Sequence, residues 1–327
     1  MKRIFSVILI LALTLGLMTA CGSDSESPAT TSPAESSEPT EGVKKPPMNI
    51  LQKNDPAQDD TLNILMIGSS YCYYYVEELW GMLDAAGIKS RVCNVYYSGC
   101  PLEKHWNWWK SGEANYEFFI TDENGRNGIK GVNLEYCLKQ GNWDIISLQE
   151  NTSRIHSGGG EAYFSTTQNY LTDLWGYIKE QFPQSRYLWH QPWSFQIGYD
   201  RNGFQMNDLT TQLVYTLSIK EYAVRVCKEF DLERVNTGEA WHLVRQNGYD
   251  NLCARMAVNG GEGDYYHDGD IGGGQYLNAC VWYEIITGQS CIGNTFRPNY
   301  TLSEDLITMF QKAAHDAVAQ MRTEDGV

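Results

Sequence analysis

Apolar runs and amphipathic segments alternate along the chain from residue 61 onward. The run "LNILMIG", Leu62–Gly68, is continuously apolar and ends in glycine, which is typical of a strand buried in a parallel sheet. Further strands of this kind are predicted at Ser90–Tyr97, Trp143–Gln149 and Arg186–Gln191, with a short fifth strand in "ERVNTG".

The segment Val76–Gly87 has apolar residues at a spacing near 3.6 and stops at a glycine, which predicts a helix. Further helices are expected over residues 163–181, 209–230, 275–287 and 303–321. Strands that alternate with helices predict a three-layer α/β/α sandwich with a mostly parallel central sheet. In such sheets ligands bind beyond the carboxyl ends of the strands.

The amino terminus has a different pattern. Lys2 and Arg3 precede a short apolar run, and "MTAC" follows it, ending at Cys21. This order is typical of an export signal, and it resembles the bacterial lipoprotein signal. The resemblance implies cleavage after residue 20 and a lipid on the Cys21 thiol, which would anchor the protein to the cell membrane, facing outside the cytoplasm. The alternative is an ordinary cleaved signal that happens to contain a cysteine.

Residues 21–60 are rich in Ser, Thr, Pro and Glu and have few large apolar side chains. Such a segment buries too little surface to offset its ordering entropy, so we expect a disordered tether. The length of residues 61–327 suits one α/β domain. The only membrane contact that this arrangement predicts is through the N-terminal lipid.

The charge and the cysteines exclude some classes of function. The formal net charge is −15, and it becomes −17 once Lys2 and Arg3 leave with the signal. A nucleic-acid partner is not expected, because phosphate binding requires a basic surface. Eight cysteines remain besides Cys21, and several lie in apolar runs, where we interpret them as core thiols rather than disulfides or zinc ligands.

Polar or glycine residues follow each predicted strand, and they include Ser70. A serine hydroxyl becomes nucleophilic when a histidine takes its proton and a carboxylate orients that histidine. Asp264 and His267, in "DYYHDGDIGGG", are spaced to supply this pair. This chemistry requires no cofactor and no metal.

In these motifs the chain resembles the SGNH, or GDSL-like, serine hydrolases. "IGSS" matches the first block with Ser70 as nucleophile, "SGC" matches the second with Gly99, and Asp264 with His267 matches the fourth. The resemblance implies an SGNH-hydrolase-like, flavodoxin-like fold. It also implies an oxyanion hole that includes the backbone N–H groups of Ser70 and Gly99.

Two blocks depart from the family pattern. Ser69 stands where the family has Asp or Asn, and "LQENTS" replaces Gly-x-Asn-Asp in the third block. Some carbohydrate-esterase branches carry Gln in the third block, so the resemblance assigns the side-chain oxyanion donor to Gln149, with Asn151 as the alternative.

The acidic residues around Asp264 and three aromatic residues near strand ends allow more than one interpretation. The acids around Asp264 lack the alternating spacing and late Glu of an EF-hand loop, so no calcium site of that kind is expected. His105, His190 and Trp193 lie at or after the ends of predicted strands and are candidates for contacts with substrate. His190 could also compete as the base, His105 could equally be a surface or core histidine, and Trp193 could simply pack in the core.

These observations favour a cell-surface serine esterase acting on carboxylic esters. The carbohydrate-esterase likeness of the third block and the tryptophans after the strands favour removal of acetyl groups from carbohydrate. A lipid or aryl ester hydrolase is the alternative enzyme. A solute-binding lipoprotein or a glycan-binding module without activity would carry the same signal and tether.

Overall fold

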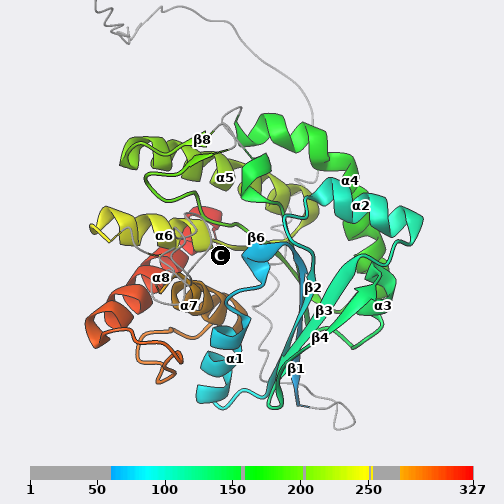
Figure 1. Cartoon of the computed structure of the whole chain (residues 1–327), viewed down its shortest axis with the longest axis horizontal. Helices are drawn as coiled ribbons and strands as arrows, with labels where there is room; N and C mark the ends of the chain where they lie inside the picture. Colours follow the sequence, from blue (N-terminus) through cyan, green and yellow to red (C-terminus); the bar gives the residue numbers. More distant parts are fainter. Residues whose placement is uncertain (1–59, 156–158, 202–203, 250–251, 253–272, 327) are drawn as a thin grey trace, which may run out of the picture. The chain divides into compact units, whose positions relative to one another are not determined.

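The computed structural model of the chain describes residues 60–155, 159–201, 204–249, 252 and 273–326. These residues form a central sheet with helices on both faces (Figure 1). The predicted three-layer α/β/α sandwich is therefore confirmed. Asp264, His267 and Cys21 lie outside the described residues, as do residues 1–59, which include the predicted signal and most of the tether.

Seven strands form the sheet in the order β4-β3-β2-β1-β5-β6-β9. They are β1 (Leu62–Gly68), β2 (Ser90–Tyr96), β3 (Tyr116–Asp122), β4 (Gly125–Val132), β5 (Ile145–Gln149), β6 (Arg186–His190) and β9 (Glu233–Val235). Strands β2, β1, β5, β6 and β9 are parallel to one another. The second parallel strand thus lies outside the first and the third lies on its other side, which is the flavodoxin-like order. A separate pair, β7 (Asp200–Arg201) and β8 (Phe204–Gln205), forms a two-stranded sheet.

The hairpin of β3 and β4 was not predicted. It pairs antiparallel with β2 and extends the sheet on that side. Most of β4 is exposed, and its sequence "GRNGIKGV" is polar and rich in glycine. A strand at the edge of a sheet does not need an apolar face, so its residues give little periodic signal.

The helices that the periodicity predicts are confirmed within a few residues. The helices are α1 (Val76–Ala85), α2 (Leu102–Ser111), α3 (Leu134–Leu138), α4 (Gly160–Gln181), α5 (Leu209–Phe230), α6 (Thr237–Gln246), α7 (Gly274–Thr287) and α8 (Glu304–Asp325). Of these, α2, α3 and α6 were not predicted; they have ten, five and ten residues.

Two apolar cores lie on the two faces of the sheet. Alternate residues of β1 point to opposite sides: Ile64 and Met66 join a core with α1, α6, α7 and α8, whereas Leu65 and Ile67 join a core with α2, α3, α4 and α5. Burial of both faces explains why β1 reads as a continuous apolar run rather than an alternating one.

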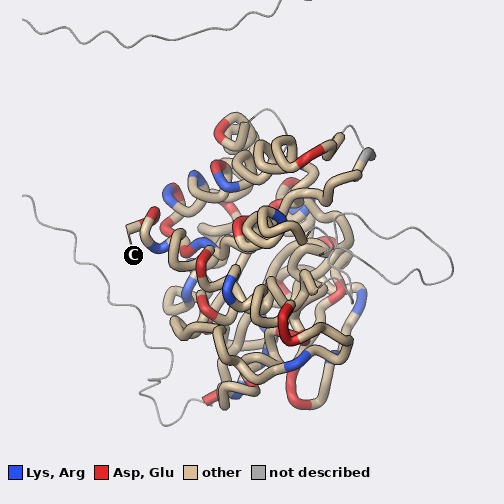
Figure 2. Tube along the Cα trace, turned by 90° about the vertical axis from the view of Figure 1, so that its left-hand side faces the viewer, with Lys and Arg blue, Asp and Glu red and all other residues tan. Residues whose placement is uncertain are grey.

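The seven described cysteines carry free thiols, and all except Cys227 are buried. This agrees with the interpretation of most cysteines as core residues. Charged residues of both signs are interspersed along the described trace (Figure 2). None of the helices in the described ranges is long and apolar enough to cross a membrane.

Candidate active site

The carboxyl ends of β1 and β5 mark the point where the strand order reverses. The chain leaves β1 toward β2 on one side, and β5 continues the sheet on the other side. In open α/β sheets this switch point is where ligands bind. Ser70 and Asn151 follow these two strands, and Gly99 follows β2. The fold therefore brings three of the predicted site residues together beyond the carboxyl ends of the parallel strands.

Ser70 begins a single 3₁₀ turn, η1 (Ser70–Cys72), directly beyond β1. The turn is closed by the amide of Tyr73, which donates to the Ser70 carbonyl at 3.2 Å. Gly68 precedes this turn, and a Cβ at that position would lie 2.4 Å from Cγ of Gln149. Glycine is therefore required where β1 ends, because any side chain would collide with the end of β5.

Two strands on the same side of β1, namely β2 and β4, hold the Ser70 turn in place. Asn94 on β2 is fully buried, and its Nδ2 donates to the Cys72 carbonyl at 2.6 Å. Arg126 on β4 donates from Nη2 to the Tyr73 carbonyl at 2.9 Å, and its guanidinium lies 3.7 Å from the centre of the Tyr73 ring. The exit of the turn is thus fixed by a buried amide and by a cation–π contact.

Gln149, the predicted side-chain oxyanion donor, contacts Ser69. Its side chain is 1% exposed, and Nε2 donates to Ser69 Oγ at 3.0 Å. Ser69 occupies the position where the resembled family has Asp or Asn. In this conformation the Gln149 amide therefore orients the residue beside Ser70.

Asn151, the alternative donor, faces the Gly99 turn. Its Oδ1 accepts hydrogen bonds from the amide of Ser153 at 3.0 Å and from the Ser153 hydroxyl at 2.8 Å. Its Nδ2 lies 3.9 Å from the position that a Cβ on Gly99 would occupy. Gly99 has φ +63°, a conformation that favours glycine, in a turn closed by the Cys100 amide bonding to Tyr97. The geometry thus pairs Gly99 with Asn151.

Glu150 lies between these two amide residues and was not predicted as a functional residue. The side chain is fully buried. It accepts hydrogen bonds from the amides of Leu102 and Asn151 and from the Tyr163 hydroxyl. Burial raises the pKa of the Glu150 carboxyl to about 7. The sequence signal that could have identified Glu150 is its position directly after an apolar strand, where a solvated carboxylate is not expected.

His190 and Trp193 do not have the predicted role of contacting substrate. Both side chains are 0% exposed. The Thr237 hydroxyl donates to the Gln191 carbonyl at 2.7 Å, so His190 Nε2, 2.9 Å from that hydroxyl, is the donor in their contact. Burial lowers the pKa of His190 to about 3, which keeps the ring neutral. Trp193 stacks on Trp241 with ring centroids 4.4 Å apart. Both are core residues under the site.

His105 is likewise a core residue rather than a substrate contact. It lies on α2 with its side chain 1% exposed, and its Nδ1 is 2.8 Å from the Tyr116 hydroxyl. Burial lowers the pKa of His105 to about 3. All three residues lie at or after the end of a strand, as predicted, but a strand end supplies inward-facing as well as site-facing side chains.

A cavity of about 190 Å³ adjoins the Gly99 and Asn151 turns. Its lining residues are Pro101, Glu103, Arg154, Tyr163, Thr166, Thr167 and Tyr170. Polar side chains from α2, η2 (Thr152–Arg154) and α4 therefore line this space, and Pro101 and Arg154 come two and three residues after Gly99 and Asn151.

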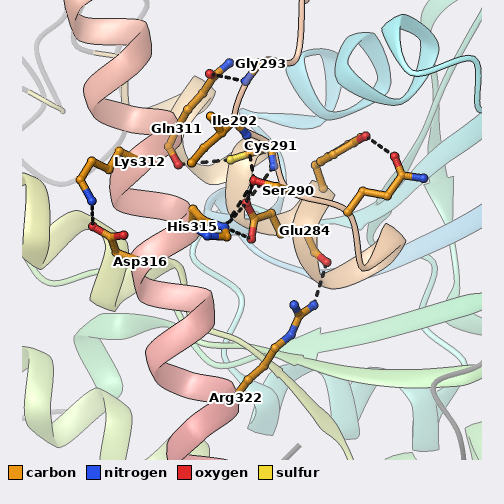
Figure 3. Close-up of polar contacts among 12 residues, drawn as sticks. Glu284, Ser290, Cys291, Ile292, Gly293, Gln311, Lys312, His315, Asp316 and Arg322 are labelled. Carbon is orange, nitrogen blue, oxygen red and sulfur yellow. Dashed lines mark hydrogen bonds and ion pairs between the residues drawn. The ribbon is translucent and has the colours of Figure 1, made fainter.

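A second group of Ser, His and Glu side chains connects α7 to α8 (Figure 3). His315 Nδ1 lies 3.1 Å from the Glu284 carboxylate and 3.4 Å from Ser290 Oγ. A catalytic triad needs the acid and the serine on opposite ring nitrogens. Here both contact Nδ1, and Glu284 also accepts from the Cys291 amide at 2.8 Å. The group is therefore a structural contact between the two helices.

Within the described residues, no group of three or more His, Cys, Asp and Glu side chains is placed to hold a metal ion. No curated protein matches this chain. Two enzymes of known structure are similar at low TM-scores. Phospholipase A1 from Streptomyces albidoflavus has TM-score 0.40 and 11% identity, with 69% of this chain and 98% of that chain covered. A GDSL-like lipase from Bacteroides thetaiotaomicron has TM-score 0.37 and 10% identity, with 69% and 89% covered.

A DUF4886 family protein from Bacteroides uniformis has a crystal structure with the same fold. Its TM-score is 0.69 at 24% sequence identity, and the match covers 80% of this chain and 95% of that one. The family model described as a domain of unknown function (DUF4886) matches residues 63–317, and the chain therefore belongs to this family.

Proposed function

We propose that this protein is a serine esterase that removes acetyl groups from carbohydrate through an acyl-enzyme intermediate. The observation that carries the proposal is the meeting of the Ser70 turn, the Gly99 turn and the Asn151 side chain at the switch point of the sheet. Acyl transfer requires a nucleophile beside preorganised N–H donors, and these three segments supply both.

In the proposed mechanism Ser70 attacks the ester carbonyl. His267 takes the serine proton through one ring nitrogen, and Asp264 holds the proton on the other nitrogen so that the ring has the required tautomer. The protonated His267 then donates to the leaving sugar oxygen. Water, activated by the same histidine, releases acetate and restores the Ser70 hydroxyl.

The oxyanion that forms during both steps needs donors that are already in place. The proposal assigns this role to the backbone N–H groups of Ser70 and Gly99 and to a side-chain amide. The geometry favours Asn151 for the amide, since its Nδ2 faces Gly99, whereas Gln149 Nε2 donates to Ser69.

Carbohydrate is favoured as the substrate by the aromatic surface beside the Gly99 turn. Tyr97 is 36% exposed and packs edge-on against Trp108 with ring centroids 4.8 Å apart. Partly exposed aromatic rings next to a polar cavity can contact the apolar face of a sugar while hydroxyl groups bond to Arg154 and Tyr170. A lipid-anchored enzyme outside the cytoplasm would meet such glycans.

The test is hydrolysis of 4-nitrophenyl acetate and of a panel of acetylated glycans by the purified protein and by Ser70→Ala. We expect the loss of the attacking oxygen to lower the rate by about 10³-fold or more without unfolding the domain. Ser111→Ala, which changes an exposed serine on α2, is the matched control and should retain the parent rate.

A fluorophosphonate probe separates this proposal from a binding function. It should label the parent and the Ser111→Ala variant but not Ser70→Ala. A parent protein that neither reacts with the probe nor hydrolyses any ester would indicate a solute- or glycan-binding lipoprotein. Activity on lipid or aryl esters alone would retain the mechanism and reject carbohydrate as the substrate.

A further inference from the structure

The buried carboxylate of Glu150 connects three segments of the candidate site. One oxygen lies 2.6 Å from the Asn151 amide, and the other lies 2.8 Å from the Tyr163 hydroxyl on α4. The Leu102 amide donates to both oxygens, at 3.3 and 3.4 Å. Leu102 is the first residue of α2 and follows the Gly99 turn by three residues. The same side chain therefore holds the second and third blocks of the site together.

The sequence explains why α2 depends on a residue from another strand. Pro101 occupies the N-cap position of α2 and provides no side-chain acceptor for the free amides of the first turn. A carboxylate at a helix N-terminus supplies this acceptor and interacts favourably with the helix dipole. Glu150 thus acts as the cap of α2 from the end of β5.

Two partners of Glu150 are backbone amides, which can only donate, and the third is the Tyr163 hydroxyl, which donates here and could also accept. An ionised carboxylate has only acceptors, so it can satisfy two backbone amides and a phenol at the same time. A protonated carboxyl carries one donor of its own, and the contact with Tyr163 must then reverse, with Glu150 donating to the phenol oxygen. The ionised form accepts all three bonds and holds the two amides more strongly, because a charged acceptor makes the stronger hydrogen bond.

We infer that Glu150 is a positioning residue, whose ionised side chain sets the distance between the Gly99 and Asn151 donors of the oxyanion hole. The inference rests on the proposed esterase function. Glu150 itself does not contact substrate. It acts through the Leu102 amide, which fixes the Gly99 turn, and through the Asn151 amide, which fixes the start of η2.

Several groups influence the ionisation of Glu150. Burial raises its pKa to about 7, while the bonds from Asn151, Tyr163 and Leu102 and the positive charge of Arg154 lower it. The other titratable groups that face it are Tyr222 from α5 and Cys100 before α2, where Lys104 is the nearby cation. Both of these acids are neutral near pH 7, because burial raises the pKa of each above its ordinary value.

The sign of the pH effect follows from this shift. The folded-state pKa lies above the unfolded value, so Glu150 favours folding most at low pH, and this contribution is lost as the pH rises through about 7. The ionised form that the site needs is thus the less stable one. We expect kcat to rise with pH through this ionisation and KM to change little, because oxyanion donors act mainly on the transition state.

The experiment compares kcat, KM and their pH profiles for the parent, Glu150→Gln and Glu161→Gln with 4-nitrophenyl acetate. Glu150→Gln keeps the size of the side chain but cannot accept all three bonds. We expect its kcat to fall about 10- to 100-fold with KM within about threefold, and the ionisation near neutral pH to disappear. Glu161→Gln, a neighbouring carboxylate that is mostly exposed, should match the parent in both respects.

Tyr163→Phe provides a second test that does not remove the carboxylate. Loss of the phenol donor should raise the pKa of Glu150 and move the rise in kcat to higher pH while the fold is retained. Amide hydrogen exchange at Leu102 reports the contact without any activity, and it should be faster in Glu150→Gln than in the parent.

The outcomes separate the two proposals. If Ser70→Ala is inactive while Glu150→Gln retains the parent kcat and pH profile, the positioning role is wrong and the esterase proposal stands. If Ser70→Ala retains the parent rate, the esterase proposal fails and the catalytic role of Glu150 fails with it. An unchanged pH profile in Tyr163→Phe would also contradict the role of Glu150.

Discussion

Two side-chain amides at the end of β5 are available for one role. Gln149 and Asn151 are two residues apart, and both can donate a hydrogen bond. Gln149 Nε2 is engaged with Ser69 Oγ at 3.0 Å, whereas Asn151 presents Nδ2 toward Gly99 and uses Oδ1 to cap the following turn. An oxyanion donor must be oriented before substrate arrives, and the bonds to Ser153 orient Asn151 in this way.

We therefore predict that Asn151→Ala lowers kcat for 4-nitrophenyl acetate by about 10²- to 10³-fold, as expected for the loss of one oxyanion donor. Gln149→Met, which keeps a similar volume, should lower kcat much less and should mainly reduce the unfolding free energy, by about 1–3 kcal/mol, because Ser69 loses its partner. Ser153→Ala removes the hydroxyl bond to Asn151 Oδ1 but keeps the amide bond, and it is the control for the contribution of this cap. A larger loss of kcat in Gln149→Met than in Asn151→Ala would restore Gln149 as the donor.

Sequence reasoning at individual positions succeeded where a strand end fixes the backbone. Ser70 and Gly99 lie where the apolar runs stop, and the structure places both beyond the carboxyl ends of β1 and β2. It failed where the direction of a side chain decides the outcome. His190 ends β6 and Trp193 follows it, but both point into the core, and Glu150 turns inward to meet donors from α2 and α4. Such contacts join residues far apart in the chain and leave no local pattern.

The β3–β4 hairpin extends the sheet and also supports the nucleophile turn. Arg126 is the connection, since it bonds to the Tyr73 carbonyl at 2.9 Å and lies over the Tyr73 and Phe119 rings at 3.7 and 4.9 Å. Its side chain is only 13% exposed. A charged donor that is largely removed from water contributes more than an exposed one.

We predict that Arg126→Ala lowers the unfolding free energy by about 2–3 kcal/mol, through the loss of a charged hydrogen bond and a cation–π contact. It should also lower the rate of labelling of Ser70 by a fluorophosphonate, because the turn after β1 loses its restraint. Lys130→Ala on the same strand is the control. Its ion pair with Glu117 is 3.7 Å long and the lysine is 81% exposed, so we expect a change below about 0.5 kcal/mol. Equal effects of the two variants in denaturant unfolding would refute the supporting role.

The predictability of each element depended on how much of it is buried. The helices α4, α5, α7 and α8 have at least 14 residues each and were located within a few residues, because each buries many apolar residues in one of the two cores. The hairpin and α2 were missed. Strand β4 is mostly exposed and has no apolar face to give a pattern, and α2 is a short helix with two fully buried side chains, Leu102 and His105.

For the molecule as a whole, the alternation of strands and helices was sufficient to predict the three layers. The order of the parallel strands then places the ends of β1 and β5 together at the switch point. The sequence could not show which polar residues at that point face one another, since this depends on how the turns pack. The acid and base of the proposed triad, Asp264 and His267, lie outside the described residues and remain predictions.

The location of the protein is the remaining prediction for the whole chain. If "MTAC" directs lipidation, Cys21 becomes the first residue and carries a lipid that holds the protein at the membrane. Cys21→Ser removes the thiol, so the chain should be released into the medium or remain unprocessed, whereas the parent stays in the membrane fraction. Fractionation of cells and mass spectrometry of the N-terminal peptide measure both results. Ser23→Ala, two residues beyond the proposed cleavage site, is the matched control and should fractionate with the parent. A parent protein found wholly outside the membrane fraction, with no lipid mass on Cys21, would contradict the anchor and indicate an ordinary cleaved signal.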